Sequence, residues 1–244
     1  MTVLMERPAD ADLAGRVAGL RRSFGELDGL GLLRALMNGP LRGEVALVSS
    51  YGSESAVLLD MVASVDRATP VIFLETGKLF PETLEYQRRL SLELGLVDVR
   101  LVRPDPADLD RYDTDPGSPL SRRDPDLCCH IRKTEPLERA LEGFGAWITG
   151  RKRFQGGARS VLPAIEGDPA SGRIKLNPLV GWSADDIRHY RRLRQLPPHP
   201  LVVQGYASIG CAPCTRPVRE GEPPRAGRWW GLDKAECGIH GDGI

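Results

Sequence analysis

The sequence lacks both net charge and long apolar segments, and each absence excludes a class of protein. Its 33 Lys and Arg residues balance 33 Asp and Glu residues, so the formal charge is zero. A general polyanion binder carries a net basic excess, and we therefore expect no nucleic-acid polymer as partner. No apolar run approaches the roughly 18–20 residues of a membrane span. The acidic start is broken by Pro8 and does not resemble a signal peptide, which predicts a cytoplasmic protein without membrane attachment.

The length and composition are those of a globular protein with many loops. Single α/β domains often run to ~250 residues, and this chain has 244, of which 41% are hydrophobic. With 27 Gly and 20 Pro, extended loops are expected. We predict one α/β domain over residues 1–217 and a loop-rich, mobile tail over residues 218–244.

Short apolar runs alternate with helical patterns along the chain. We expect strands at 44–49, 70–75, 97–102 and 145–149, and helices at 10–37, 56–65, 81–90, 129–142 and 183–195. Residues 104–127 and 197–244 are interpreted as loops. This alternation predicts a doubly wound, mostly parallel sheet. Ligands of such sheets bind at the carboxyl ends of the strands, which brings together the loops 49–55, 75–80 and 150–160.

The first two of these loops are candidate substrate contacts. Backbone N–H groups at a helix N-terminus, with nearby hydroxyls, form an anion site, although capping alone explains such residues equally well. The first loop is neither a Walker A nor a GxGxxG sequence. The candidates are Ser49, Ser50, Gly52, Ser53 and Glu54 in the first loop and Thr76 and Gly77 in the second.

The third loop carries four cations within nine residues: Arg151, Lys152, Arg153 and Arg159. In a protein of zero net charge, this density favours a local anion clamp over a solvated face. Arginine suits phosphate or sulfate, because its planar guanidinium group donates two hydrogen bonds at once.

Five cysteines are present, and four of them form two pairs, Cys128 with Cys129 and Cys211 with Cys214. Clustered cytosolic cysteines are more often metal ligands or redox nucleophiles than disulfides. A thioredoxin-like dithiol at Cys211 would need a following helix, which the proline-rich residues 216–224 cannot form. Four thiolates fit zinc or an iron–sulfur cluster. Because adjacent cysteines diverge, we favour [4Fe–4S], which spreads its ligands over a larger volume than zinc does.

Cys237 stands apart from these pairs in a glycine-rich tail. Lys234 and His240 flank it, and either can stabilise the reactive thiolate. We therefore predict that Cys237 is a nucleophile rather than a spare thiol.

From residue 49 to residue 240, the chain resembles the assimilatory sulfonucleotide reductases, specifically the iron–sulfur type that reduces adenosine 5′-phosphosulfate. The resemblance rests on the CC…CxxC set, the segment LETGKLFPET, the run RAGRWW at 225–230 and the terminal ECGIH. It implies an adenine nucleotide α-hydrolase-like fold with a modified pyrophosphate loop at 49–55. It also implies a [4Fe–4S] cluster on Cys128, Cys129, Cys211 and Cys214.

The resemblance further implies roles for single residues. Cys237 matches the nucleophile, and Lys133 matches a lysine between cluster and substrate. Arg159, Arg225 and Arg228 match substrate-binding arginines. Two positions depart from the family pattern: Tyr51 stands where a small residue is expected, and Phe154 stands where an aspartate is expected.

The implied reaction is the reduction of adenosine 5′-phosphosulfate to sulfite and AMP, within sulfate assimilation toward cysteine. Cys237 would carry an S-sulfonate, which thioredoxin or a glutaredoxin-like dithiol would discharge. The 3′-phosphorylated substrate remains an alternative, as do an ATP pyrophosphatase and a non-catalytic zinc module. The sequence also allows a homo-oligomer.

Overall fold

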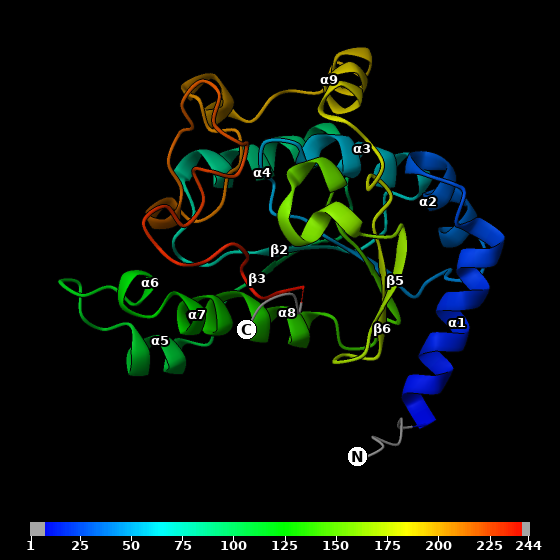
Figure 1. Ribbon diagram of the computed structural model, residues 1–244, viewed down its shortest axis with the longest axis horizontal. Helices are drawn as coiled ribbons and strands as arrows, with labels where there is room; N and C mark the ends of the chain where they lie inside the picture. Colours follow the sequence, from blue (N-terminus) through cyan, green and yellow to red (C-terminus); the bar gives the residue numbers. More distant parts are fainter. Residues whose placement is uncertain (1–7, 241–244) are drawn as a thin grey trace.

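A six-stranded sheet forms the middle of the molecule (Figure 1). The computed structural model describes residues 8–240. The strand order is β3-β2-β1-β4-β6-β5, and all neighbours are parallel except β5 and β6. The strands are β1 (Val45–Val48), β2 (Val71–Leu74), β3 (Val99–Val102), β4 (Ala146–Ile148), β5 (Ile165–Asp168) and β6 (Arg173–Leu176).

Helices cover both faces of the sheet, as expected for a doubly wound fold. One face carries α2 (Gly29–Met37), α3 (Ser55–Val65), α4 (Pro81–Glu93) and α9 (Ala184–Leu193), while α1 (Pro8–Phe24) lies along β5. The other face carries α5 (Pro106–Tyr112), α6 (Leu120–Arg123), α7 (Pro125–Cys129) and α8 (Glu135–Ala140). Within residues 8–240, no helix is both long and apolar enough to cross a bilayer.

The strand order confirms the predicted sheet and locates its ligand-binding edge. The chain winds outward from β1 to β2 and β3, then returns to the other side of β1 with β4. The crevice between the carboxyl ends of β1 and β4 is therefore the topological switch point, where open α/β sheets bind ligands. The loops that follow β1 and β4 are the predicted segments 49–55 and 150–160.

The single helix expected at 10–37 is wrong, because two helices occupy this segment. α1 ends at Phe24, and the N–H of Gly25 bonds the carbonyl of Arg21. α2 begins at Gly29, whose φ of +46° places it in the left-handed region that favours glycine. A Cβ on Gly29 would lie 3.0 Å from the Trp182 ring, so a side chain there would meet that indole.

The loop expected at 104–127 is also wrong, since α5, α6 and α7 lie there. The prolines that suggested a loop stand in the first turns of α5 and α7, where a missing N–H costs nothing. Asp105 and Asp124 cap these two helices by accepting from backbone N–H groups two and three residues further on.

The helix expected at 129–142 begins earlier and is interrupted. A π-turn, η1 (His130–Thr134), joins α7 to α8. Pro136 lacks the N–H that would bond the carbonyl of Arg132, which accounts for the widened turn. β5 was not predicted, because its sequence, Ile165-Glu-Gly-Asp168, has no apolar alternation. The remaining helical segments are short 3₁₀ turns: η2 (Arg153–Gln155), η3 (Gly157–Val161), η4 (Pro200–Gln204) and η5 (Ala212–Cys214).

Candidate active site

A pocket of about 210 Å³ opens at the switch point, between the ends of β1, β2 and β4 and the C-terminal segment. Figure 1 shows that segment, in orange and red, passing from the α4 side of the sheet to a point beside α8. The pocket brings together most of the residues singled out from the sequence. Those that line it are Ser49, Ser50, Gly52, Ser53, Glu54, Thr76, Lys133, Arg151, Lys152, Arg159, Cys211, Arg225, Arg228, Cys237 and His240.

The first loop closes one wall of this pocket ahead of α3. Ser53 donates its hydroxyl to the carbonyl of Ala207 at 2.7 Å, which ties the loop to the C-terminal segment. Glu54 pairs with Lys152 of the third loop, with 2.9 Å between carboxylate and ammonium. The two loops are thus joined by an ion pair across the switch point.

Tyr51 turns away from the pocket. Its φ is +48°, and its fully buried ring packs edge-on against Phe73. Its hydroxyl lies 2.9 Å from the hydroxyl of Ser91 in α4. Neither Tyr51 nor Phe154 is among the lining residues, so neither departure from the family pattern enters the pocket.

The second loop connects the pocket to the cysteines. The Thr76 hydroxyl lies 3.3 Å from the Cys211 thiol, and the Thr76 carbonyl accepts from Arg132 at 2.6 Å. Arg132 also pairs with Asp113 at 2.6 Å, and the backbone N–H of Leu120 donates to the same carboxyl. Burial would raise the pKa of Asp113, but these donors and Lys78 lower it to about 2. Gly77, with φ at +71°, shapes the turn without lining the pocket.

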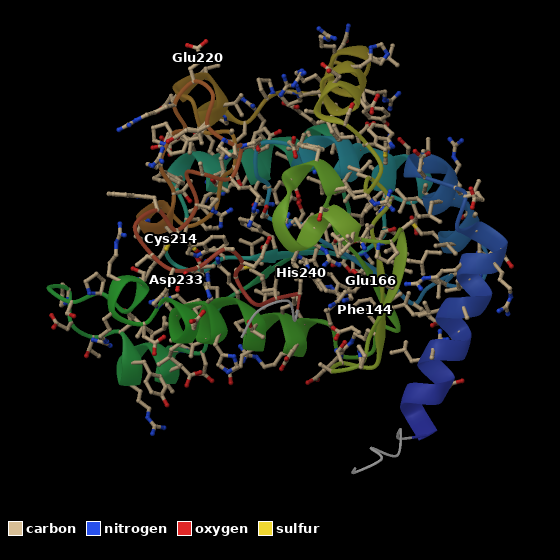
Figure 2. The ribbon with its side chains drawn as sticks, in the orientation of Figure 1. Phe144, Glu166, Cys214, Glu220, Asp233 and His240 are labelled. Carbon is tan, nitrogen blue, oxygen red and sulfur yellow. The ribbon has the colours of Figure 1, made fainter. Side chains whose placement is uncertain are left out.

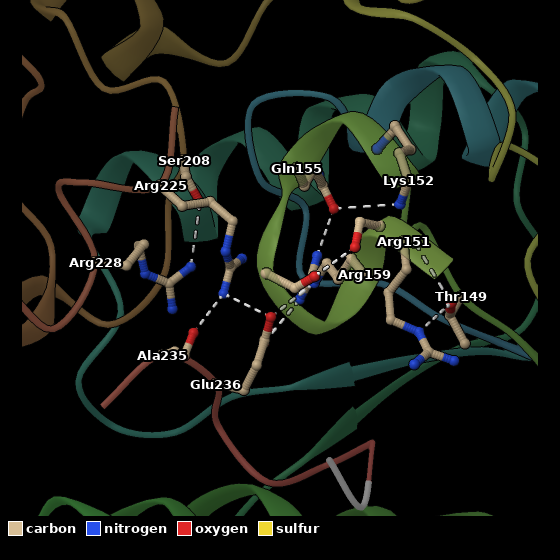
Figure 3. A network of polar contacts seen from close by, with 12 residues as sticks. Thr149, Arg151, Lys152, Gln155, Arg159, Ser208, Arg225, Arg228, Ala235 and Glu236 are labelled. Atoms are coloured by element: carbon tan, nitrogen blue, oxygen red, sulfur yellow. Dashed lines mark hydrogen bonds and ion pairs between the residues drawn. The ribbon is translucent and has the colours of Figure 1, made fainter. Parts of the chain in front are cut away.

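The third loop supplies cations in two different settings (Figure 3). Arg159 points into the pocket, whereas Arg151 contacts Glu166 and donates to the hydroxyl of Thr149 at 3.3 Å. Burial lowers the pKa of Lys152, and the nearby charge of Glu54 partly offsets that effect. Arg153 donates to the carbonyl of Leu162.

Glu236 of the C-terminal segment meets two of these cations. Its carboxylate accepts from Arg159 at 2.7 and 2.8 Å and lies 3.0 Å from Arg225 (Figure 3). Burial and the neighbouring charge of Arg159 lower the pKa of Arg225 to about 10. Both burial and the nearby Arg159 charge disfavour the charged form of Arg225, and a bound anion would favour it.

Arg228 completes the cationic wall. Its guanidinium carbon lies 4.4 Å from the centre of the Trp229 ring, and it donates weakly to the carbonyl of Ile209 at 3.4 Å. Its buried Nε has no hydrogen-bond partner within the described part of the chain. A Cβ on Gly210 would lie 2.3 Å from this guanidinium, so the close approach of Arg228 requires glycine.

Four cysteines are buried next to this pocket, and Figure 2 shows Cys214 in the space between the two helical layers. Burial and the charges of neighbouring thiolates raise the pKa of Cys128 to about 12. At Cys211, burial would likewise raise the pKa, but Lys133, Thr76 and Arg228 bring it below its usual value. The charges that act on Cys128 include those of Cys211 and Cys214, which indicates that the two sequence pairs lie near each other.

The surroundings of these thiols fit an iron–sulfur cluster. Two buried donors near the thiols bear on this fit. Arg132, whose charge acts on Cys128, and Trp229, which packs on Cys211 and Cys214, each bury an N–H without a partner among these residues. Buried donors normally find acceptors, and cluster sulfurs would accept from them.

Lys133 lies between the cysteines and the pocket. Burial would lower its pKa, but the thiolates of Cys211, Cys237 and Cys129 raise it overall. Cys237 packs against the Cys211–Cys214–Trp229 cluster and lines the pocket. One cation thus faces both the predicted ligands and the predicted nucleophile.

The two residues expected to assist Cys237 are engaged elsewhere. Lys234 pairs with Asp126 of α7. The ring of His240 stacks on Trp147, with 5.4 Å between ring centres and 2° between their planes. Burial and the surrounding cations Arg151, Arg159 and Lys175 lower the pKa of His240 well below its usual value, so the imidazole is neutral at pH 7.

Sequence reasoning missed Glu236, Trp147 and Lys175. Glu236 stands out in the sequence only as part of ECGIH, although a carboxylate next to the nucleophile of a cationic pocket is a usable signal. Trp147 and Lys175 lie in strands, where sequence patterns indicate core packing rather than contact with a distant segment.

The strand order and the position of the pocket define a doubly wound α/β protein with its candidate site at the carboxyl ends of the strands. Residues 44–217 match the phosphoadenosine phosphosulfate reductase domain. The chain therefore belongs to this family, which confirms the resemblance found in the sequence.

Curated relatives and a solved structure agree with this assignment. The chain is 46% identical over 236 residues to the adenosine 5′-phosphosulfate reductase of Mesorhizobium japonicum, covering 97% of this chain and 91% of the relative. It is 50% identical over 202 residues to the protein of the same name from Chelativorans sp., covering 83% and 81%. The crystal structure of phosphoadenylyl-sulfate reductase from Candida auris superposes with a TM-score of 0.69 at 24% identity, covering 88% of this chain and 100% of that one, and supports the fold.

Proposed function

We propose that this protein reduces adenosine 5′-phosphosulfate to sulfite and AMP, using electrons from a thioredoxin-like dithiol. The observation that carries the proposal is the position of Cys237 in a cationic pocket at the switch point, facing Lys133. The cationic side chains of the pocket come from three separate segments of the chain. They can therefore contact a ligand from several sides, which suits a nucleotide with two adjacent anionic groups.

The first step transfers the sulfo group to the enzyme. The Cys237 thiolate attacks the sulfur of the phosphosulfate, and the bond between that sulfur and the bridging oxygen breaks. AMP leaves with the electron pair, and an S-sulfonate remains on Cys237. Because nucleophile and substrate are both anionic, the step requires compensating charge, which Lys133, Arg159 and Arg225 supply.

The second step releases sulfite. A thiolate of the reductant attacks the Cys237 sulfur, sulfite leaves with the electron pair, and a mixed disulfide forms. The second thiol of the reductant then attacks the reductant's sulfur in this mixed disulfide. The disulfide bond to Cys237 breaks, and Cys237 leaves as a thiolate. The dithiol supplies both electrons, and sulfur passes from the hexavalent to the tetravalent state.

Cys128, Cys129, Cys211 and Cys214 would hold a [4Fe–4S] cluster. When bound, the cluster would supply a compact negative charge near Lys133. In this proposal, Lys133 positions the sulfo group by charge, while Thr76 and Arg132 hold the Cys211 end of the ligand set. Ser49, Ser50, Gly52 and Ser53 would contact the nucleotide from the α3 side.

Mass spectrometry of the anaerobically purified protein, incubated with adenosine 5′-phosphosulfate and no reductant, tests this proposal. We expect one added SO₃ on the Cys237 peptide, which thioredoxin discharges as sulfite, and no adduct on Cys237→Ser. An adduct formed only with the 3′-phosphorylated nucleotide would assign that substrate instead. No adduct on a protein that retains its iron, together with ATP hydrolysis, would overturn the proposal in favour of a pyrophosphatase.

A further inference from the structure

The residues that follow Cys237 lie on the sheet face that carries α8. Ile239 packs against a small apolar cluster formed by Ala46, Ile72, Leu137, Leu141 and Trp147. These residues belong to β1, β2, β4 and α8 together with the turn after α8. The C-terminal segment therefore contacts the rigid centre of the fold at this point.

Trp147 and Lys175 form the polar half of the same contact. They are direct neighbours in the register of β4 and β6, and the ammonium of Lys175 lies 5.6 Å from the centre of the Trp147 ring. The ring of His240 stacks flat on Trp147, and Lys175 donates to the His240 carbonyl at 2.8 Å. Figure 2 shows His240 between the two helical layers. Side chain and backbone of one tail residue are thus both held by the sheet.

Lys175 is itself held in place. Its ammonium lies 3.1 Å from the carboxylate of Asp168 in β5, and the hydroxyl of Ser171 donates to the same carboxylate at 2.9 Å. Lys175 is only 4% exposed. A lysine is rarely buried to this degree unless it is paired, and an apolar residue would otherwise suit this strand position. The partners of the ammonium thus include one carboxylate of the sheet and one carbonyl of the tail.

We propose that Trp147 and Lys175 form a dock for Ile239 and His240, and that this dock positions Cys237 in the pocket. The inference rests on the proposed role of Cys237 as nucleophile. Three residues of chain span at most about 10 Å, so a fixed His240 confines the Cys237 sulfur to a small volume. Gly238, at a φ of +83°, provides the turn between nucleophile and dock.

The dock complements the contact on the other side of Cys237. Glu236 is held by Arg159 and Arg225, which are the groups that the substrate needs. When a nucleotide takes these arginines, Glu236 is released, and the dock still holds the chain on the C-terminal side of Cys237. Trp147 also lines the pocket, whereas Lys175 does not. In this proposal both act as positioning residues, which hold the tail rather than bind the reacting sulfur.

The test compares the iron-loaded protein with three variants, Lys175→Met, Lys175→Arg and Ile239→Ala, and with Arg173→Met as matched control. Arg173 lies on the same strand, and its guanidinium donates to the Phe144 carbonyl rather than to the tail. The first readout is the alkylation rate of Cys237 by iodoacetamide without substrate, followed peptide by peptide. The second is the single-turnover rate of S-sulfonate formation at saturating nucleotide, with nucleotide affinity measured separately.

We expect Lys175→Met and Ile239→Ala to raise the alkylation rate and to lower the sulfonation rate, each by about tenfold, the change that about 1.4 kcal/mol produces. Nucleotide affinity should stay within about twofold of the wild type, and Lys175→Arg should restore both rates because it keeps the donor and the charge. Ile239→Ala leaves Lys175 and its ion pair intact, so it tests the dock even where Lys175→Met unfolds the sheet. Because Ile239 also lines the pocket, the separate measurement of nucleotide affinity distinguishes lost positioning from lost binding.

Unchanged alkylation and sulfonation rates in both Lys175→Met and Ile239→Ala would overturn the dock while leaving the proposed function intact. The dock would also be overturned if Arg173→Met changed the two rates as much as Lys175→Met does. If the wild type forms no S-sulfonate but Cys237 alkylation still accelerates in the variants, the dock stands and the proposed function fails.

Discussion

The carboxylate of Glu236 binds the guanidinium of Arg159 through two hydrogen bonds, at 2.7 and 2.8 Å, one residue before the cysteine that we propose as nucleophile. Side-chain exposure at this pair is 12% and 15%, so solvent screens it only in part. The tail thus places its own negative charge where the anionic oxygens of the substrate should bind. If the proposed function is right, tail and substrate compete for the same cations.

Replacing Glu236 with Gln should tighten nucleotide binding. The amide keeps the size of the side chain but removes the competing charge, so Arg159 and Arg225 become available to the phosphosulfate. We expect the dissociation constant to fall about tenfold, since charge-assisted hydrogen bonds contribute roughly 1.5–3 kcal/mol. Calorimetric titration in a Cys237→Ser background, which prevents turnover, measures the change.

The matched control for this substitution is Glu222→Gln. Glu222 pairs with Arg216 at 2.8 Å, and neither residue lines the pocket. The dissociation constant of this control should equal that of the parent protein. Weaker binding in Glu236→Gln would contradict competition and would indicate that the carboxylate helps to organise the two arginines for substrate.

The five cysteines should separate into two functional groups on substitution. If the protein carries the proposed [4Fe–4S] cluster, it should be brown as purified, and Cys214→Ser should lose both colour and iron because one of four ligands is missing. The substitution should also lower the midpoint of thermal unfolding, since buried Lys133 then lacks the negative charge of the cluster. Cys237→Ser should retain wild-type iron and colour but lose all turnover.

Iron analysis, visible absorption and calorimetry on the two variants side by side provide the measurement. Zinc in place of iron in the wild type would refute the cluster. Equal iron loss in both variants would refute the separation of ligands from nucleophile.

The sequence predicted the location of the site better than its internal contacts. The carboxyl ends of the four predicted strands could be located from the sequence. Because ligands of doubly wound sheets bind at these ends, the loops 49–55 and 150–160 could be placed together without a structure. The prediction that the paired cysteines are metal or cluster ligands needed only their residue type and spacing. Pro106 and Pro125 led to the wrong prediction of a loop at 104–127, because a proline that begins a helix cannot be distinguished locally from one that breaks it.

Pairings between distant segments could not be predicted. Lys234 stands close to Cys237 in the sequence, which suggested that it assists the thiolate, yet its partner is Asp126, 108 residues away. The contact of Lys175 with the tail likewise depends on strand register and tail path together. Neither contact could be predicted, because the periodicity of a sequence shows which face of an element is buried and not which segment covers it.

Tyr51→Phe tests whether Tyr51, which stands where the family pattern has a small residue, affects substrate binding. The hydroxyl bonds Ser91, and the ring points into the core, so removal of the oxygen should cost about 1 kcal/mol of unfolding free energy. KM and kcat should not change, because Tyr51 does not line the pocket. Urea unfolding and steady-state kinetics are the measurements. A KM shift of about tenfold or more would mean that the loop backbone transmits the change to the nucleotide.

His199 should make the protein sensitive to acid well away from the active site. It is fully buried; the N–H of Leu201 donates to its Nδ1 at 3.1 Å, so Nε2 carries the proton and donates to the Thr83 hydroxyl at 3.0 Å. Burial lowers the pKa of His199 to about 4. Because the unfolded chain binds a proton near pH 6.5 and the folded chain does not, stability is complete above about pH 6.5 and falls as the pH drops toward 4.

This difference in pKa corresponds to a loss of about 3 kcal/mol across that window. His199→Asn keeps an acceptor for Leu201 but cannot titrate, so it should be less stable than the wild type at pH 7.5 and lose less stability on acidification. Urea unfolding at intervals between pH 7.5 and 4.5 measures both slopes. His189→Asn, on the exposed face of α9, is the matched control and should keep the wild-type slope. If His199→Asn and wild type lost stability in parallel, the acid sensitivity would have to come from other groups, because the imidazole in contact with Thr83 would then be titrating alike in the folded and unfolded chain.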